Sequence, residues 1–532
     1  MRSPRNGTST GAATSTANSG APRGIRTLVP ALRGLCPRPL DDGSARSGRT
    51  PGGSLYYKPR IQCLKQRVLL NDKSFQQNDS DSSKPLVVSR EDHPISRANI
   101  SPNALKVLYR LKDAGYQAFL VGGAVRDLLL GLNPKDFDIA TNAHPDQVKQ
   151  LFRNCRLIGR RFHLAHVRFG YEIIEVATFR AAHTPIDDDN SVDESGHRVL
   201  DARGRILRDN LYGTIEEDVW RRDFTANALY YNIEDFSVWD YVGGVEDARN
   251  RVLRLIGDPE TRYREDPVRM LRAVRFAAKL GFELHPDTAA PINKLAWMLD
   301  GVPPARLFDE INKLFLSGSA VRAIDLLNHY GLLEHLFPDV ADALREAPDS
   351  AATKLLRIGL AGTDERVRAD KSVTPTFLFA VLLWPAISRA FKSNVTLGAS
   401  NAGNDIQHMA HACEVVTARQ QSRIAVPKRF TLPMREVISM QPRFNMRSGR
   451  RSLRILDHPR FRAAYDFLLL RSAAGEVDPE LGTWWTEIQE LPAEERIARV
   501  DQRPVSAGEP RAAGARKKRR RRRPAKPATS NG

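Results

Sequence analysis

The spacing of apolar residues changes several times along this chain of 532 residues, and each change predicts a different kind of structure. Residues 1–95 show little periodicity and are rich in Gly, Pro, Ser, Gln and Asn, which predicts a disordered N-terminal extension. Ser101 is a predicted helix N-cap ahead of spaced leucines. After Asp258 the apolar spacing is helical to about residue 490. We therefore expect an α+β fold in which a sheet-containing region precedes an all-helical one.

Between residues 96 and 250, short extended runs alternate with helical segments and glycine turns. Two apolar runs joined at Gly170-Tyr171 predict a β-hairpin, and the acidic, irregular residues 181–205 predict a loop. The expected fold here is a mixed or antiparallel sheet with helices packed on it. The predicted strands cover residues 117–121, 136–139, 161–169 and 172–179, and short helices are predicted at residues 123–130 and after Pro145.

Lysine and arginine outnumber the acidic residues, which gives a formal net charge of +19. Such a charge favours a polyanionic partner, either nucleic acid or an anionic membrane surface. The most apolar stretch, residues 377–387, contains Pro385 and is shorter than the ~20 residues that a membrane-spanning helix needs. We therefore predict a buried helix there and no membrane insertion.

The four cysteines are scattered without a CxxC pair, which argues against a disulfide framework and suits a reducing cytosol. The N-terminus has no continuous apolar segment of the kind that a secretory signal contains. Its first residues are rich in Ser, Thr, Ala and Arg, as in an organelle transit peptide. A disordered extension or a misassigned start codon is the simpler interpretation.

Asp136 and Asp138 form the strongest chemical signal in the chain. Residues two apart in a strand point to the same face, so both carboxylates would lie together while Phe137 and Ile139 point into the core. Two such carboxylates repel one another unless a cation lies between them, and Mg²⁺ prefers hard oxygen ligands. The pair predicts a magnesium site, although alternating acids also occur on exposed strands.

A glycine turn, Gly122-Gly123, precedes this strand and opens a predicted helix. Glycines let backbone amides approach a phosphate closely, and a helix N-terminus adds partial positive charge. Arg126, in the first turn of the helix, could reach the same phosphate. The alternative is a turn without chemistry. The chain contains neither GxxxxGK[ST] nor GxGxxG, so a P-loop or a dinucleotide site is not supported.

Further charged residues follow in sequence. Glu175 lies in the otherwise apolar second strand of the predicted hairpin, where burying a charged side chain would cost free energy unless it had a partner. An antiparallel neighbour could bring it beside the aspartate pair as a third carboxylate; a solvent-facing acid is the alternative. Downstream, Arg221, Arg222 and Asp223 could hold a phosphate and a ribose hydroxyl together, or form a surface salt-bridge cluster.

A later helix is predicted to open at Glu265-Asp266-Pro267 and to end at Gly281. In the simplest interpretation Asp266 is its N-cap. Asp266 and Arg269 are three residues apart and would share a face, offering an acceptor and a donor that match adenine and cytosine but not uracil or guanine. One arc of this helix is basic, which indicates either a solvated face or the lining of a nucleotide or RNA path. The basic residues are Arg269, Arg272, Arg275 and Lys279.

Four motifs, in this order, resemble those of the bacterial-type tRNA nucleotidyltransferase and poly(A) polymerase superfamily. They are Gly122-Gly123-x-Val125-Arg126-Asp127, Asp136-x-Asp138, Arg221-Arg222-Asp223 and Glu265-Asp266-x-x-Arg269. Residues 157–167, 427–430 and 461–466 resemble the poly(A) polymerase version rather than the CCA-adding version. The resemblance covers roughly residues 95–475.

The resemblance implies a nucleotidyltransferase head at residues 96–250 and a helical neck with a base-recognition helix at 251–310. A helical body and RNA-binding region at 311–490 and a disordered basic tail at 491–532 complete the expected organisation. The implied enzyme is a bacterial, cytoplasmic poly(A) polymerase. It would add AMP from ATP to RNA 3′ ends without a template, using two Mg²⁺ ions. A CCA-adding tRNA nucleotidyltransferase and a catalytically silent RNA-binding relative are the alternatives.

The predicted site combines the residues and the resemblance. Asp136 and Asp138 are expected to bind metal and act in catalysis, with Glu175 as a metal ligand and Asp223 as a catalytic residue. Which of Glu175 and Asp223 is the third catalytic acid stays open. The predicted ATP-binding residues are Gly122, Gly123, Arg126, Arg221, Arg222, Asp266 and Arg269. The predicted RNA-binding residues are Arg272, Arg275 and Lys279 and, from the run of eight basic residues at 516–523, Arg516, Lys517, Lys518, Arg519 and Arg520. A solvated tail is the alternative for that run.

Overall fold

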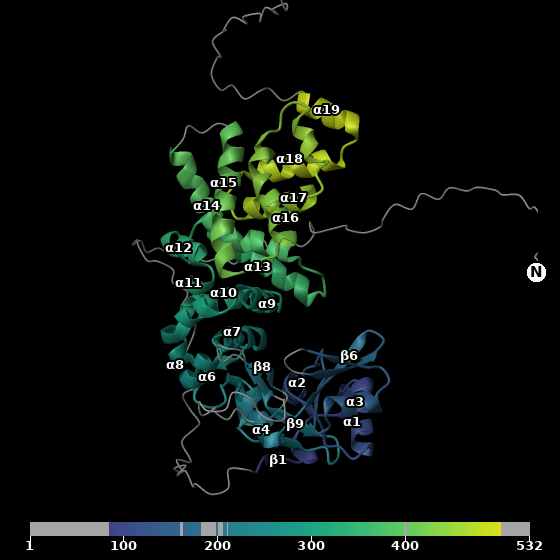
Figure 1. Cartoon of the computed structure of the whole chain (residues 1–532). Helices are drawn as coiled ribbons and strands as arrows, with labels where there is room; N and C mark the ends of the chain where they lie inside the picture. The colour runs from purple at the N-terminus through teal and green to yellow at the C-terminus, as the bar shows by residue number, and fades with distance from the viewer. Residues whose placement is uncertain are drawn as a thin grey trace, which may run out of the picture. The chain divides into compact units, whose positions relative to one another are not determined.

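The computed structural model describes residues 84–159, 163–181, 198–200, 206–209, 211–397 and 402–501. The basic run at residues 516–523 and most of the predicted N-terminal extension lie outside these residues. The fold is α+β, as expected, with a mixed sheet and its helices first and a helical region after it (Figure 1).

Within the described residues, eight strands form one mixed sheet in the order β1-β10-β9-β2-β3-β6-β5-β4. The β3–β6 pair is parallel, and the other neighbouring strands in this sheet are antiparallel. The strands are β1 (Leu86–Val88), β2 (Ala118–Val121), β3 (Asp138–Thr141), β4 (Cys155–Ile158), β5 (Leu164–Phe169), β6 (Glu172–Thr178), β9 (Leu229–Asn232) and β10 (Val238–Asp240).

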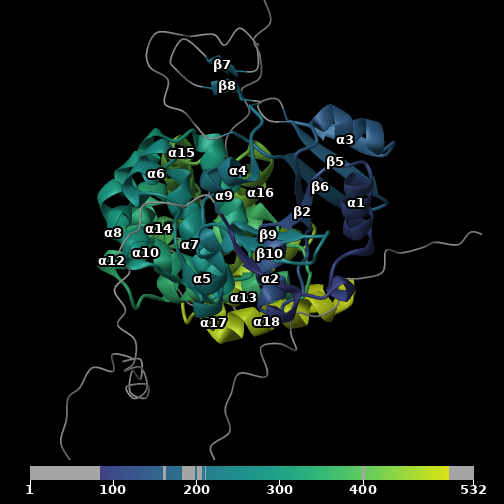
Figure 2. The ribbon, with the colours of Figure 1, turned by 90° about the horizontal axis from the view of Figure 1, so that it is seen from below.

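The two faces of this sheet are covered differently. Helices α1 (Pro102–Asp113) and α3 (Pro145–Leu151) pack on one face, α1 against β2, β3 and β6 and α3 against β4, β5 and β6 (Figure 2). Ser101 caps α1 as predicted, because its side chain accepts from the amide of Asn103. On the other face, α4 (Ile215–Arg221) packs over β2 and β3, where Ile215 and Val219 join the buried cluster. Short helices α2 (Gly123–Leu129) and α5 (Gly244–Asn250) flank the sheet.

Two strand pairings differ from the sequence-based expectation. Strand β1 lies inside the segment expected to be disordered, and pairs with β10, which is distant in sequence. Residues 198–200 form β7 (Arg198–Leu200), which pairs with β8 (Ile206–Asp209), although an irregular loop was expected there. In both cases a three-residue strand is too short to produce a recognisable alternation, and its hydrogen bonds come from another segment.

The helical region shares one continuous buried cluster that extends from Phe224 to Val500. The predicted helix at residues 377–387 is confirmed, and it contributes Trp384 to this core. Two short strands, β11 (Val252–Leu253) and β12 (Glu283–Leu284), pair in parallel beside the first helices. The helices are α6 (Pro259–Glu265), α7 (Val268–Leu280), α8 (Pro286–Leu295), α9 (Pro304–Phe315), α10 (Ala320–His329), α11 (Leu332–Leu336), α12 (Pro338–Glu346), α13 (Ala351–Arg368), α14 (Pro375–Leu397), α15 (Ala402–Arg423), α16 (Lys428–Ser439), α17 (Phe461–Ala473), α18 (Pro479–Glu490) and α19 (Ala493–Asp501).

The predicted domain boundaries stay predictions, with two local exceptions. Helix α9 runs through residue 310, so the expected neck and body are not separated by a linker at that position. Helix α19 lies in the segment expected to be a disordered tail. The segment is helical as far as Asp501 because the Val500 side chain is buried in the core. None of the helices in the part of the chain that the structure describes has the length and apolar character that crossing a membrane requires.

Candidate active site

Asp138 and Glu175 face each other across the two parallel strands of the sheet. Asp138 is the first residue of β3, and its register partner on β6 is Glu175. The sequence predicted this proximity but an antiparallel pairing, and the pairing is parallel. The reason is that the hairpin inserts its second strand, β6, between β3 and β5, so that β6 runs in the direction of β3. Residues paired in register lie on the same face, which brings the two carboxylates together.

Asp136 completes an acidic group with these two residues. It precedes β3 rather than lying in it, yet the predicted alternation holds, because Phe137 is buried while Asp136 and Asp138 are exposed. The pKa of Asp138 rises to about 6, first through partial desolvation of its carboxyl and then through the negative charges of Glu175 and Asp136. Among the described residues, no group of three or more His, Cys, Asp or Glu side chains has the arrangement of a ready metal site.

The glycine turn lies directly beside the acids, because Val121 pairs with Asp138. Gly122 has φ +74° and ψ −137°, a conformation that essentially only glycine adopts, and its amide donates to the carbonyl of Leu229 at 3.1 Å. A Cβ on Gly122 would come within 3.7 Å of Arg222 Nη1. The turn therefore brings backbone close to an arginine that lines a cavity.

Arg126 points into the protein. Its side chain is buried, its Nε donates to Asp127 Oδ1 at 2.9 Å, and its Nη1 donates to Asn227 Oδ1. In this structure Arg126 joins α2 to the segment after Asp223, and its guanidinium is already engaged. Its predicted contact with a triphosphate stays a prediction.

A cavity of about 260 Å³ opens beside the acids and the glycine turn: it is lined by Ala177, two residues from Glu175 on the same face of β6, and by Arg222, which lies close to Gly122. Five arginines line it, against one acidic residue, Asp218, so it suits a polyanion such as a triphosphate. Two of the five, Arg180 and Arg262, were not singled out from the sequence, because they come from segments with no motif. The lining residues are Ala177, Arg180, Asp218, Arg221, Arg222, Arg262 and Arg269.

Arg222 is held in place by Asp218 and Tyr230. Asp218 Oδ2 lies 2.9 Å from Arg222 Nη2, and Arg222 Nε donates to the Tyr230 hydroxyl at 2.7 Å. Burial raises the pKa of Tyr230, so its hydroxyl stays protonated and donates to Asp218 at 2.7 Å. This fixed geometry orients the Arg222 guanidinium within the cavity.

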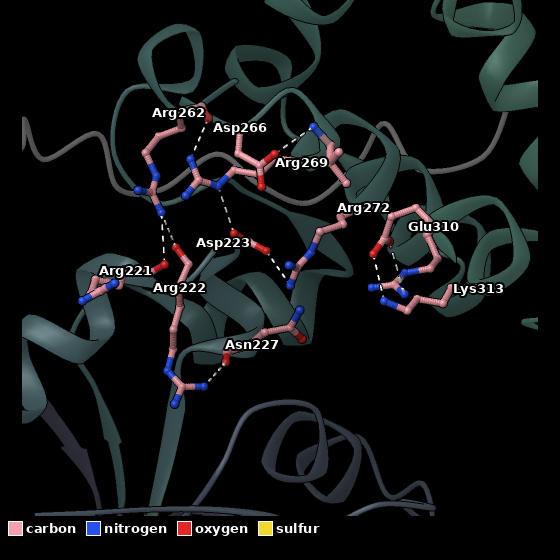
Figure 3. Close-up of polar contacts among 12 residues, drawn as sticks. Arg221, Arg222, Asp223, Asn227, Arg262, Asp266, Arg269, Arg272, Glu310 and Lys313 are labelled. Carbon is pink, nitrogen blue, oxygen red and sulfur yellow. Dashed lines mark hydrogen bonds and ion pairs between the residues drawn. The ribbon is translucent and has the colours of Figure 1, made fainter. Parts of the chain in front are cut away.

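Asp223 faces helix α7 (Figure 3). Its Oδ1 accepts from Arg269 Nε at 3.1 Å, and its Oδ2 lies 2.6 Å from Arg272 Nη2. The charged groups that shift the pKa of Asp138 are Glu175, Asp136 and Arg222. Glu175 thus lies with the aspartate pair, whereas Asp223 anchors the arginines of α7.

Asp266 does not lie on the helix of Arg269. It ends α6 in an extended conformation, and α7 begins two residues later, at Val268. Asp266 therefore lies outside α7, one residue before its N-cap Pro267, and the predicted joint contact of Asp266 and Arg269 with a base stays a prediction. Asp266 Oδ2 pairs with Arg306 Nη2 of α9 at 2.7 Å, and its Oδ1 accepts from the amide of Val268. The end of α7 at Gly281 is confirmed.

The predicted basic arc of α7 is present, but most of its charge is paired. Arg269 lies 2.7 Å from Glu265, and Arg275 lies 3.8 Å from Glu310. Arg269 and Arg272 also contact Asp223 (Figure 3). Lys279, at the end of the arc, is exposed. Most of this face therefore serves to fasten α7 to neighbouring segments, which charge patterning in one helix cannot reveal.

A parallel strand pair with facing acids, a glycine turn and an arginine-lined cavity together define a nucleotidyltransferase. Residues 118–254 match the family described as "Poly A polymerase head domain". Residues 281–344 match "Probable RNA and SrmB- binding site of polymerase A", and residues 402–526 match "Polymerase A arginine-rich C-terminus". The chain is 48% identical to poly(A) polymerase I of Salmonella typhimurium over 440 residues, which are 81% of this chain and 91% of that protein. It belongs to the bacterial poly(A) polymerase I family.

The CCA-adding enzymes are similar over a shorter part. The CCA-adding enzyme of Bacillus subtilis is 40% identical over 233 residues, which are 44% of this chain and 55% of that protein. Among solved structures, the apo form I of a tRNA-processing enzyme is 21% identical with a TM-score of 0.49, covering 76% of this chain and 99% of that one.

Proposed function

We propose that this protein adds AMP from ATP to RNA 3′ ends without a template. The observation that carries the proposal is the arginine-lined cavity beside the Asp138–Glu175 pair, in a chain that resembles poly(A) polymerase I over most of its length. The cavity would take the triphosphate, and the acids would lie where the acceptor hydroxyl meets the α-phosphorus.

Carboxylate oxygens are the ligands that a divalent metal such as Mg²⁺ prefers. The charges of Glu175 and Asp136 oppose ionisation of Asp138, and a bound cation would offset that repulsion. We propose that Asp136, Asp138 and Glu175 would hold two Mg²⁺ ions. When bound, such ions activate the attacking hydroxyl and neutralise charge on the leaving pyrophosphate.

The chain's own residues bind and orient the nucleotide in this proposal. Arg221 and Arg222 attract the triphosphate, and Tyr230 and Asp218 keep Arg222 in position. The Gly122-Gly123 turn lets the backbone approach the phosphates without a side chain in the way. Arg126 acts indirectly in this proposal, because its hydrogen bond to Asn227 holds that residue against α2.

Asp223 supports base selection rather than metal binding. Its contact with Arg269 orients that guanidinium, which also lies 2.7 Å from Glu265. We propose that Arg269 and Asp266 read the Watson–Crick edge of the base, which selects A and C over U and G. The pairing of Asp266 with Arg306 would then have to adjust when a base enters.

RNA would be bound by Lys279 and by the basic run at residues 516–523, which lies outside the described residues. Binding of a phosphate backbone by such a run is non-specific and strongly salt-dependent. We further propose the bacterial cytoplasm as the location, where ATP and RNA ends are available; the described cysteines, Cys155 and Cys413, are free thiols.

One experiment separates this function from its rivals. The protein is incubated with Mg²⁺, a single nucleoside triphosphate and either an oligo(A) primer or a tRNA that lacks CCA. Long tails from ATP alone on the generic primer support the proposal. Addition confined to tRNA that stops after CCA would identify a CCA-adding enzyme. RNA binding with no incorporation of any nucleotide would identify a silent relative.

A further inference from the structure

The row of paired residues that contains Asp138 and Glu175 continues across two more strands. His166 on β5 is the register partner of Glu175, and its Nε2 lies 3.2 Å from Glu175 Oε1. Arg156 on β4 is in turn the register partner of His166. Register partners lie on one face, so Asp138, Glu175, His166 and Arg156 form a line across β3, β6, β5 and β4. Neighbouring strands are ~4.8 Å apart, so the line extends ~14 Å beyond Asp138.

A second pair lies on the same face beside this line. Arg168 and Ile173 are register partners two residues from His166 and Glu175, and residues two apart in a strand share a face. The Ile173 side chain is 46% exposed, and Arg156 and Arg168 are exposed as well. No salt bridge of Arg156 or Arg168 occurs among the residues that the structure describes. We call Arg156, His166, Arg168 and Ile173 the outer strip.

The opposite face of these strands is occupied. Helix α3 packs on β4, β5 and β6 there, and Val167, Ile174 and Val176 are buried against it. The outer strip is therefore on the face that the catalytic acids use, and it begins where the acids end. Its composition, two arginines and a histidine with one exposed apolar side chain, matches a nucleic-acid strand, whose phosphates are anionic and whose bases can pack through their flat ring faces.

The direction of the reaction assigns this strip to one of the two substrates. In nucleotidyl transfer the attacking and leaving oxygens lie roughly in line on opposite sides of the phosphorus. The arginine cavity, which would hold the leaving pyrophosphate, is lined by Ala177, which follows Glu175 by two residues on the same face of β6. Ile173 of the outer strip precedes Glu175 by two residues on that face, so the cavity and the strip lie on opposite sides of Glu175 along β6. The attacking hydroxyl would therefore approach from the side of the outer strip.

We infer that the outer strip binds the last nucleotides of the acceptor RNA, with Arg156 and Arg168 contacting phosphates and Ile173 packing against a base. This inference rests on the proposed function and adds the path of the RNA strand to it. The strand would enter over β4 and β5 and end with its 3′-hydroxyl at Glu175 and Asp138.

The test is RNA binding measured by fluorescence anisotropy on the full chain, across a range of salt concentrations. Arg156→Glu and Arg168→Glu should each weaken binding of an oligo(A) primer about fivefold at ~0.1 M salt. Arg156→Ala should lower the slope of log Kd against log salt by about 0.7, the loss of one phosphate contact on a single strand. The KM for ATP should change by less than about twofold, because neither arginine lines the nucleotide cavity.

Lys149→Glu is the matched control, because Lys149 is also exposed but lies on α3, on the covered face. If one of the two glutamate variants lowers the melting temperature, the other variant still tests whether the outer strip binds RNA. Binding by both variants no weaker than that of Lys149→Glu would overturn the inference. The anisotropy experiment measures RNA binding and does not depend on catalysis. A wild-type protein that incorporates no ATP would therefore refute the proposed function, and the anisotropy data would still test the RNA contact of the outer strip.

Discussion

Replacing Asp223 by asparagine tests whether this residue fastens α7 or takes part in the chemistry. Asp223 is 11% exposed and contacts Arg269, which is 12% exposed, and Arg272, which is 38% exposed. Removing one partner of a fully buried ion pair costs about 3–5 kcal/mol. Here Arg269 keeps Glu265 and Arg272 is partly solvated, so the cost should be reduced to about 2 kcal/mol. The melting temperature should fall by about 4 °C.

The assay combines thermal melting with steady-state kinetics over a range of Mg²⁺ concentrations. Asp223→Asn should raise the KM for ATP, because Arg269 lines the cavity and loses its anchor, and should leave the Mg²⁺ dependence unchanged. Glu175→Gln should do the opposite, lowering kcat at least about 100-fold with little change in melting. Asp325→Asn, in an exposed pair with Arg357, is the control and should cost less than about 1 kcal/mol. An Asp223→Asn protein that melts normally and cannot turn over saturating ATP would refute this reasoning and make Asp223 a catalytic acid.

Three further predictions concern stability. Gly122→Ala should destabilise by about 1–3 kcal/mol in urea denaturation, because φ +74° with ψ −137° strains any other residue. Gly123→Ala, at the first residue of α2, should destabilise much less, because alanine has a higher helix propensity than glycine. Equal losses of stability in the two variants would contradict this explanation. Tyr230→Phe should cost about 1 kcal/mol and raise the KM for ATP, since Arg222 loses one of its two side-chain contacts; an unchanged KM would show that this contact is unnecessary. Burial raises the pKa of the Cys413 thiol to about 11 from 9.0, so the unfolded thiol ionises first and stability should fall as the pH rises from 9 towards 11. Cys413→Ala should lessen that fall, and an identical pH dependence in both proteins would exclude the thiol as its cause.

Much of the acid site could be predicted from sequence because its geometry is local. A two-residue spacing sets the shared face of Asp136 and Asp138, and a single acid in an apolar strand made Glu175 noticeable. The direction of β6 could not be predicted in this way, because it depends on which strand of the hairpin pairs with β3. That choice is decided by tertiary packing on α1 and α3.

The nucleotide cavity could be predicted only in part. Arg221 and Arg222 stand out as adjacent charges, but Arg180 and Arg262 reach the cavity from other segments and carry no spacing signal. The basic arc of α7 was recognised from its periodicity, while its partners Asp223 and Glu310 lie on other segments. Periodicity identifies a face of a helix, and the fold decides what that face contacts.

The most direct test of the central claim is a primer-extension ladder on an unstructured RNA with ATP and Mg²⁺, comparing wild type with Asp138→Asn. Asp146→Asn is the control, since Asp146 is an exposed acid on α3, on the opposite face of the sheet. The account predicts a long ladder from wild type and from the control, and at least about 100-fold slower extension by folded Asp138→Asn. A ladder from Asp138→Asn as long and as fast as that of wild type would contradict it.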